Sequence, residues 1–175
     1  EQEIRRQDPT TSFNEFVQVR LGLDTERYKS QLRWEVEREM LGERVVRAFV
    51  MGQARVELRV VVVRSESDMQ AAQARLAEGE DFAVVAREFS VDPSAGFGGV
   101  IPPVLRNGTA LSQLAFATPV GAVGGPIEEE GRWLMLEVID RPEPLAGDWA
   151  EIREAVEDSL RAAPLADPEY WQWKS

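Results

Sequence analysis

The chain has 175 residues, 43% of them hydrophobic, and contains neither cysteine nor histidine. That size suits one folded domain or two small ones. The 20 basic and 31 acidic residues give a net charge of −11, which argues against a nucleic-acid partner because phosphate backbones attract basic surfaces. Disulfides and thiolate or imidazole metal sites are excluded, so we expect no metal and no cofactor. No apolar run approaches the roughly 18 residues of a membrane span.

Residues 1–54 predict two helices. Ser12 and Glu15 have the spacing of a capping box, and Gly22 should end the short helix that follows. A second helix should begin at Asp24 or Thr25. Its apolar side chains recur at helical spacing: Tyr28, Leu32, Val36, Met40, Leu41 and Val45.

Residues 55–142 predict alternating strands and helices. The β-branched run from Val56 to Arg64 is typical of a buried strand. Helices are expected over 68–77, over the segment that Asp81 caps, and over 111–117, and an exit strand over 133–140. Gly96, Gly98 and Gly99 should form a tight turn.

Residues 143–175 predict one helix and an aromatic tail. Asp148 and Glu151 form a helix start, and the apolar stripe after it comprises Trp149, Ile152, Val156 and Leu160. Since large aromatic rings are seldom left in water, Tyr170, Trp171 and Trp173 should dock on the body of the protein or on another copy of the chain.

The motifs between positions 81 and 141 resemble a known family. DFAVVAREFSVDPSAGFGG is followed by AFATPVGAVGGPIEEEGRWLMLEVIDR, an order of signals similar to that of the parvulin-type (PpiC, rotamase) peptidyl-prolyl isomerases. The helices before residue 55 resemble those of the chaperone-isomerases of the SurA and PrsA kind. The resemblance implies an α+β fold: a parvulin-like antiparallel sheet wrapped by helices, plus an all-α domain formed by the N- and C-terminal helices. Phe13, Phe16, Tyr28, Trp34 and Trp149 would line its cradle.

The positions of the family's polar catalytic residues are apolar in this sequence. The resemblance aligns the first-strand histidine with Val60, the polar residue after the glycine turn with Val100, and the last-strand histidine with Trp133. Val100, Leu111, Phe116 and Trp133 are the candidates for lining a substrate cleft. The sequence thus predicts no confident catalytic residue and no metal ligand.

Three functional hypotheses follow. The first is a folding factor of the SurA and PrsA type that binds unfolded, extended or proline-containing polypeptide, with isomerase activity weak or lost. The second is an active isomerase with a divergent site, and the third is a structural or assembly module that uses the fold as a scaffold. Trp133 distinguishes them, because a ring that fills the cleft prevents binding there. The resemblance implies a periplasmic or cell-envelope location.

Overall fold

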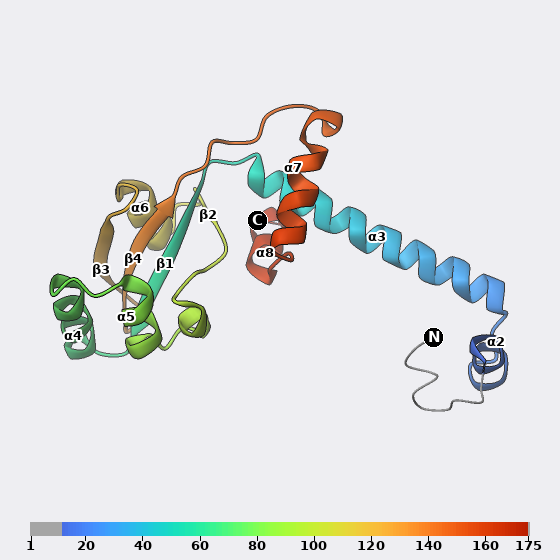
Figure 1. The fold of residues 1–175 in the computed structure, drawn as a ribbon, viewed down its shortest axis with the longest axis horizontal. Coiled ribbons are helices and arrows are strands. Elements are labelled where there is room, and N and C mark those ends of the chain that lie inside the picture. The colour runs from blue at the N-terminus through green and yellow to red at the C-terminus, as the bar shows by residue number, and fades with distance from the viewer. Residues whose placement is uncertain (1–11, 175) are drawn as a thin grey trace. The chain divides into compact units, whose positions relative to one another are not determined.

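The structure, a computed structural model, describes residues 12–174 (Figure 1). The beginning of the predicted N-terminal region, residues 1–11, and the final Ser175 lie outside them. The described residues form two compact units, one ending at Val45 and the other beginning at Val46. Within residues 12–174, no helix combines the length and the apolar character needed to cross a membrane.

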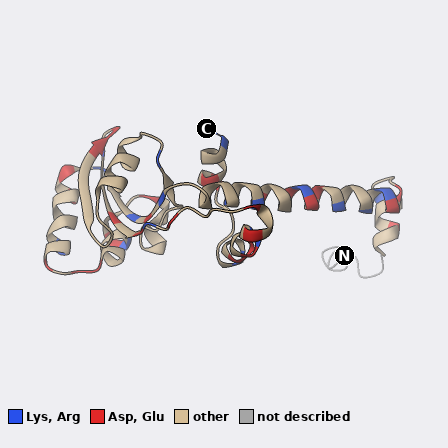
Figure 2. Cartoon of the chain, turned by 90° about the horizontal axis from the view of Figure 1, so that it is seen from above, with Lys and Arg blue, Asp and Glu red and all other residues tan. Residues whose placement is uncertain are grey.

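The first unit consists of α2 (Phe13–Glu15), a π-helical turn over Phe16–Arg20 and most of α3 (Thr25–Met51). As predicted, the Ser12 side chain caps α2 by accepting the Glu15 N–H at 3.2 Å. The aromatic rings of Phe13 and Tyr28 lie 6.2 Å apart, centroid to centroid. Basic and acidic residues both recur along α3 (Figure 2). The apolar residues that the helical spacing picks out are exposed: Leu32, Val36, Met40, Leu41 and Val45.

The second unit contains a four-stranded antiparallel sheet in the order β2-β1-β4-β3. β1 (Arg55–Val63) and β4 (Arg132–Asp140) are the long central strands. β2 (Val104–Leu105) and β3 (Val123–Glu129) form the edges. The predicted α+β class with an antiparallel sheet is confirmed.

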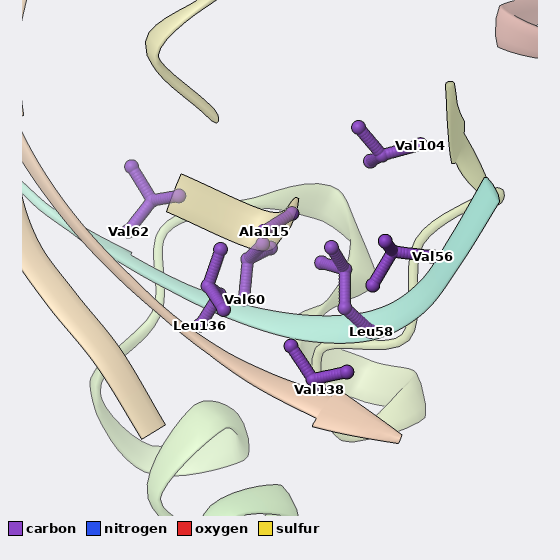
Figure 3. Close-up of a cluster of buried hydrophobic side chains, with 8 residues drawn as sticks. All are labelled: Val56, Leu58, Val60, Val62, Val104, Ala115, Leu136 and Val138. Atoms are coloured by element: carbon purple, nitrogen blue, oxygen red, sulfur yellow. The ribbon is translucent and has the colours of Figure 1, made fainter. Parts of the chain in front are cut away.

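Helices cover both faces of the sheet (Figure 1). α6 (Ala110–Ala117) packs on one face, where the first hydrophobic cluster lies: Val56, Leu58, Val60, Val62, Val104, Ala115, Leu136 and Val138 (Figure 3). α4 (Glu66–Ala77) and α5 (Phe82–Phe89) cover the other face. The second cluster there consists of Val61, Val63, Met69, Ala72, Phe82, Val85, Ala86 and Met135. Because side chains alternate along each strand, neighbouring valines of β1 belong to different clusters.

Side-chain caps fix where the helices of this unit begin. Asp81 accepts the Ala83 N–H at 2.8 Å, and Ser65 and Thr109 cap α4 and α6 in the same way. α7 (Trp149–Ala162) opens on the predicted capping box, in which Asp148 and Glu151 exchange side-chain-to-backbone hydrogen bonds. Of these four caps, the sequence analysis assigned those at Asp81 and Asp148.

Three elements of the second unit were not predicted: β2, β3 and α8 (Asp167–Lys174). β3 runs through Gly124, Gly125 and Pro126, residues that are typical of turns. It forms nevertheless because β4 pairs with Val123 and Gly124 and again with Ile127–Glu129, while the register shifts at Gly125 and Pro126. Tertiary pairing thus overrides the local propensity.

The C-terminal helices join the end of α3 through Arg47. Its guanidinium bonds to the Glu169 carboxylate at 3.0 and 3.1 Å and to the Ser159 hydroxyl at 2.7 Å. Both charged side chains are almost completely buried. The tail therefore docks through a buried ion pair, while Tyr170, Trp171 and Trp173 remain 39%, 66% and 40% exposed.

Candidate functional site

Val60 lies in the middle of β1 and is 2% exposed. It belongs to the cluster under α6, between Leu58, Val62 and Leu136 (Figure 3). Its N–H donates to the Gly99 carbonyl at 2.8 Å. The position aligned with the first histidine is therefore a close-packed aliphatic one.

Trp133 lies on the opposite face of the sheet from Val60. It is opposite Val63 in the β1–β4 ladder, and it packs half-buried against the cluster under α4 and α5. The two positions aligned with the family's histidines therefore do not converge on one cleft in this chain. Of the two side chains, only that of Trp133 carries a polar group, its indole N–H.

Leu111 and Phe116 both lie on α6 and pack against the same cluster as Val60. Two guanidinium groups flank the Phe116 ring. Arg106 lies 4.1 Å from the ring centroid and Arg141 lies 5.7 Å from it. Arg141 also donates to the carbonyls of Phe116 and Thr118, so it fastens the end of α6. The ring is thus partly covered by cations.

The glycine turn holds the next segment against β1. Gly99 has a φ of +80°, and a Cβ built on it would lie 2.4 Å from the Val60 carbonyl oxygen. Only glycine fits this close backbone approach. The turn then places Val100 beside Arg59, to which it is bridged in antiparallel fashion. The DPSAGFGG motif is thus held against β1 by backbone contacts.

Val100 is 45% exposed and lines a cavity of about 600 Å³. After Val100, the chain passes through Pro102 and Pro103, which have no N–H and cannot continue the ladder to β1. The pairing resumes only at Val104, opposite Val56. The cavity is bordered by this interrupted segment, by the start of β1 and by the C-terminal helices. Its lining comprises Arg47, Val50, Met51, Arg55, Glu57, Leu58, Val100, Ile101, Pro102, Pro103, Ile139, Ser159, Ala162, Ala163, Pro164, Ala166 and Glu169.

The C-terminal helix α8 reaches this segment through Gln172. The side-chain amide of Gln172 donates to the Pro103 carbonyl at 3.2 Å. Together with the Arg47–Glu169 pair, this bond ties α8 to two borders of the cavity. Sequence reasoning found Val100 but missed Arg55, Glu57 and the C-terminal contribution.

The predicted site residues are thus distributed over three places. Val60, Leu111 and Phe116 share the α6 face, Trp133 lies on the α4 and α5 face, and Val100 opens onto the cavity. The α6-face residues carry no side-chain donor or acceptor. This arrangement is suited to apolar contact rather than to proton transfer or nucleophilic attack.

Comparison with known proteins agrees with the motifs. Residues 63–140 match the family of PPIC-type PPIase domains, called rotamase. The chain is 25% identical over 109 residues to the foldase protein PrsA of Clostridium acetobutylicum, a match covering 60% of this chain and 33% of the relative. It is 34% identical over 85 residues to the chaperone SurA of Pseudomonas syringae, covering 47% and 20% of the two chains. The chain therefore spans a third or less of the length of these relatives.

The fold is also similar to that of a solved protein. The crystal structure of PrsA from Bacillus subtilis superimposes with a TM-score of 0.53 at 16% identity, over 91% of this chain and 71% of that one. At this identity the likeness concerns the fold alone. Together with the matched motifs, it leads to one conclusion: residues 63–140 form a rotamase domain of the PpiC, or parvulin, type.

Proposed function

We propose that this chain is a folding factor that binds unfolded or extended polypeptide, with peptidyl-prolyl isomerase activity weak or lost. The observation that carries the proposal is the separation of Val60 and Trp133 on opposite faces of the sheet. The relatives named PrsA and SurA support the folding-factor part. The same relatives and the sequence resemblance support a periplasmic or cell-envelope location.

The energetics of prolyl isomerisation explain why isomerase activity should be weak. The amide must cross a rotational barrier of about 18–20 kcal/mol, and a catalyst lowers it by binding the twisted amide better than the planar one. Oriented polar groups provide most of that preference. Around Val60 the side chains are aliphatic or aromatic, and Trp133 points into another cluster. This face offers desolvation without oriented dipoles.

The polypeptide-binding part of the proposal is supported by the cavity beside Val100. A volume of about 600 Å³ accommodates several side chains, and most of the lining residues are apolar. The lining comes from elements far apart in the sequence, so a ligand there would contact both the rotamase domain and the C-terminal helices. We propose the same three segments for the functional organisation: 1–54, 55–142 and 143–175.

The test combines catalysis and client protection. Cis-trans exchange of a proline peptide is measured by exchange NMR without protease, and aggregation of an unfolded client is measured in parallel, for the parent and for Trp133→Ala. We expect no exchange above background from either protein and suppressed aggregation by both. Exchange well above background by the parent would instead establish an isomerase with a divergent site. Absence of both effects would leave the scaffold hypothesis.

A further inference from the structure

Arg55 is a buried cation in the cavity wall, and no ion pair within the described residues neutralises it. The residue is 8% exposed, and its Nη1 donates to the Met51 carbonyl at 2.7 Å. Among residues 12–174 this is its only hydrogen bond, and no carboxylate oxygen lies within 4.0 Å of its nitrogens. Its other nitrogens are not fully buried, whereas Nε of Arg59 is fully buried and has no hydrogen-bond partner among the described residues. Four of its five N–H donors therefore have no hydrogen-bond partner among the described residues.

Arg47 in the same wall shows what a structural arginine looks like. It is buried to the same degree, but its guanidinium is engaged by Glu169, by Ser159 and by the carbonyls of Ala163 and Pro164. That network holds α3, α7 and α8 together. Arg55 has no such network, although an unpaired buried charge is costly. Among residues 12–174 no carboxylate pairs with Arg55, so its remaining N–H donors can bind an acidic group that enters the cavity.

We propose that the cavity binds an extended apolar polypeptide segment that carries an acidic side chain, and that Arg55 receives the carboxylate. This inference rests on the proposed function and names the class of client segment. A guanidinium fork pairs with a carboxylate through two parallel hydrogen bonds. The apolar residues around it, including Val50, Leu58 and Ile139, receive the neighbouring side chains of the segment.

The carboxylate of Glu57 should reduce the affinity of the cavity for an acidic segment. It is half-buried, lines the same cavity and forms no ion pair with Arg55. Its charge therefore opposes an acidic ligand without neutralising the arginine. Replacing Glu57 by glutamine should strengthen the binding of an acidic segment, whereas replacing Arg55 should weaken it.

The probe is a pair of fluorescent peptides, both acetylated and amidated so that their ends are uncharged. Each is an extended ten-residue sequence of alternating valine and serine, with a central glutamate in one and a glutamine in the other. Affinity is measured by fluorescence anisotropy at low salt for the parent, Arg55→Gln and Glu57→Gln. Arg64→Gln is the matched control, because it removes the same charge at an exposed residue just beyond β1.

The parent should bind the glutamate peptide about tenfold more tightly than the glutamine peptide, as expected for a charge-assisted hydrogen-bonded pair. Arg55→Gln should abolish this ratio, Glu57→Gln should increase it, and Arg64→Gln should leave it unchanged. Equal binding of the two peptides by the parent would overturn the inference, and this comparison needs no variant to fold. A third peptide, the glutamine sequence with a free C-terminal carboxylate, is measured beside them. Tight binding of this peptide would also overturn the inference, because Arg55 would then recognise the end of a chain and not an acidic side chain. If both peptides bind equally well and client aggregation is still suppressed, the proposed function stands without this preference.

Discussion

The α6 face of the sheet and the cavity beside it differ in packing and in charge. On the α6 face, Val60 and Leu136 are buried in a cluster of aliphatic side chains. A few residues before Val60 in β1, Arg55 and Glu57 line an open volume of about 600 Å³. The first region contains Val60, one of the three positions that the family resemblance aligns with catalytic residues. The second is where this chain has space and charge.

This difference shows how a fold persists when its chemistry changes. Apolar side chains at buried positions avoid the cost of burying polar groups, so the sheet gains a filled core where the resemblance expects a polar centre. The two prolines at 102 and 103 interrupt the pairing with β1 and leave room beside the C-terminal helices. The proposed binding therefore takes place at the cavity, which Val100 lines, and not at the α6 face.

The largest effect is expected at the buried ion pair that borders the cavity. Glu169→Ala leaves the Arg47 charge buried without a carboxylate, which should lower the free energy of unfolding by about 3–5 kcal/mol. Urea denaturation measures the change. Glu154→Ala, on the exposed side of α7, is the control and should change it by less than about 0.5 kcal/mol. A loss below about 1 kcal/mol in Glu169→Ala would show that the pair does not hold the helices.

The next effect tests the packing of the α6 face. Leu136 is completely buried, so Leu136→Ala should cost about 2–5 kcal/mol through lost burial and the cavity left behind. Ile139→Ala, at the partly exposed rim of the existing cavity, should cost clearly less in the same denaturation experiment. Equal losses would remove the contrast between a filled and an open region.

An effect of intermediate size is expected at the glycine turn, where Gly121→Ala serves as the matched control for Gly99→Ala. Gly99 and Gly121 have nearly the same φ, +80° and +79°, but a Cβ at Gly99 would collide with the Val60 carbonyl, whereas nothing lies within 4 Å at Gly121. Both alanine variants carry the strain of positive φ, which costs about 1 kcal/mol. Thermal melting should show an additional loss for Gly99→Ala. Identical melting temperatures would mean that the turn does not hold Val100 against β1.

The smallest effect is expected at Arg106. Its stacking on Phe116 is an exposed cation–π contact, so Arg106→Ala should cost about 0.5–1 kcal/mol. A double-mutant cycle with Phe116→Leu isolates the pair from other effects of the charge. A coupling energy indistinguishable from zero would show that the arginine does not cover the ring in solution.

The sequence predicted the elements whose signals are local. The caps at Asp81 and Asp148 and the β-branched run of β1 occur in the structure within a few residues of the expected bounds. β3 was missed because Gly124, Gly125 and Pro126 oppose a strand locally, and only pairing with β4 reveals it. α8 was read as an aromatic tail because its anchor, Glu169, is an ordinary acidic residue until Arg47 is placed beside it.

The candidate site was less readable for a similar reason. Alignment of motifs gave Val60 and Trp133 one role, but strand register sends their side chains to opposite faces. Arg55 carries no sequence signal as one of 20 basic residues. Its proposed role follows from its burial, from the absence of a nearby carboxylate among the described residues, and from cavity-lining residues of α7 and α8 that are more than 100 positions away in the chain.

The most direct test of the account is to locate a bound client by methyl NMR. An unfolded polypeptide is titrated into protein labelled at the Val, Leu and Ile methyl groups. The account predicts that the shifts concentrate at cavity residues such as Val50, Val100 and Ile139. Shifts concentrated instead at Leu111, Leu114 and Leu134, which pack around Val60, would contradict it and return binding to the α6 face.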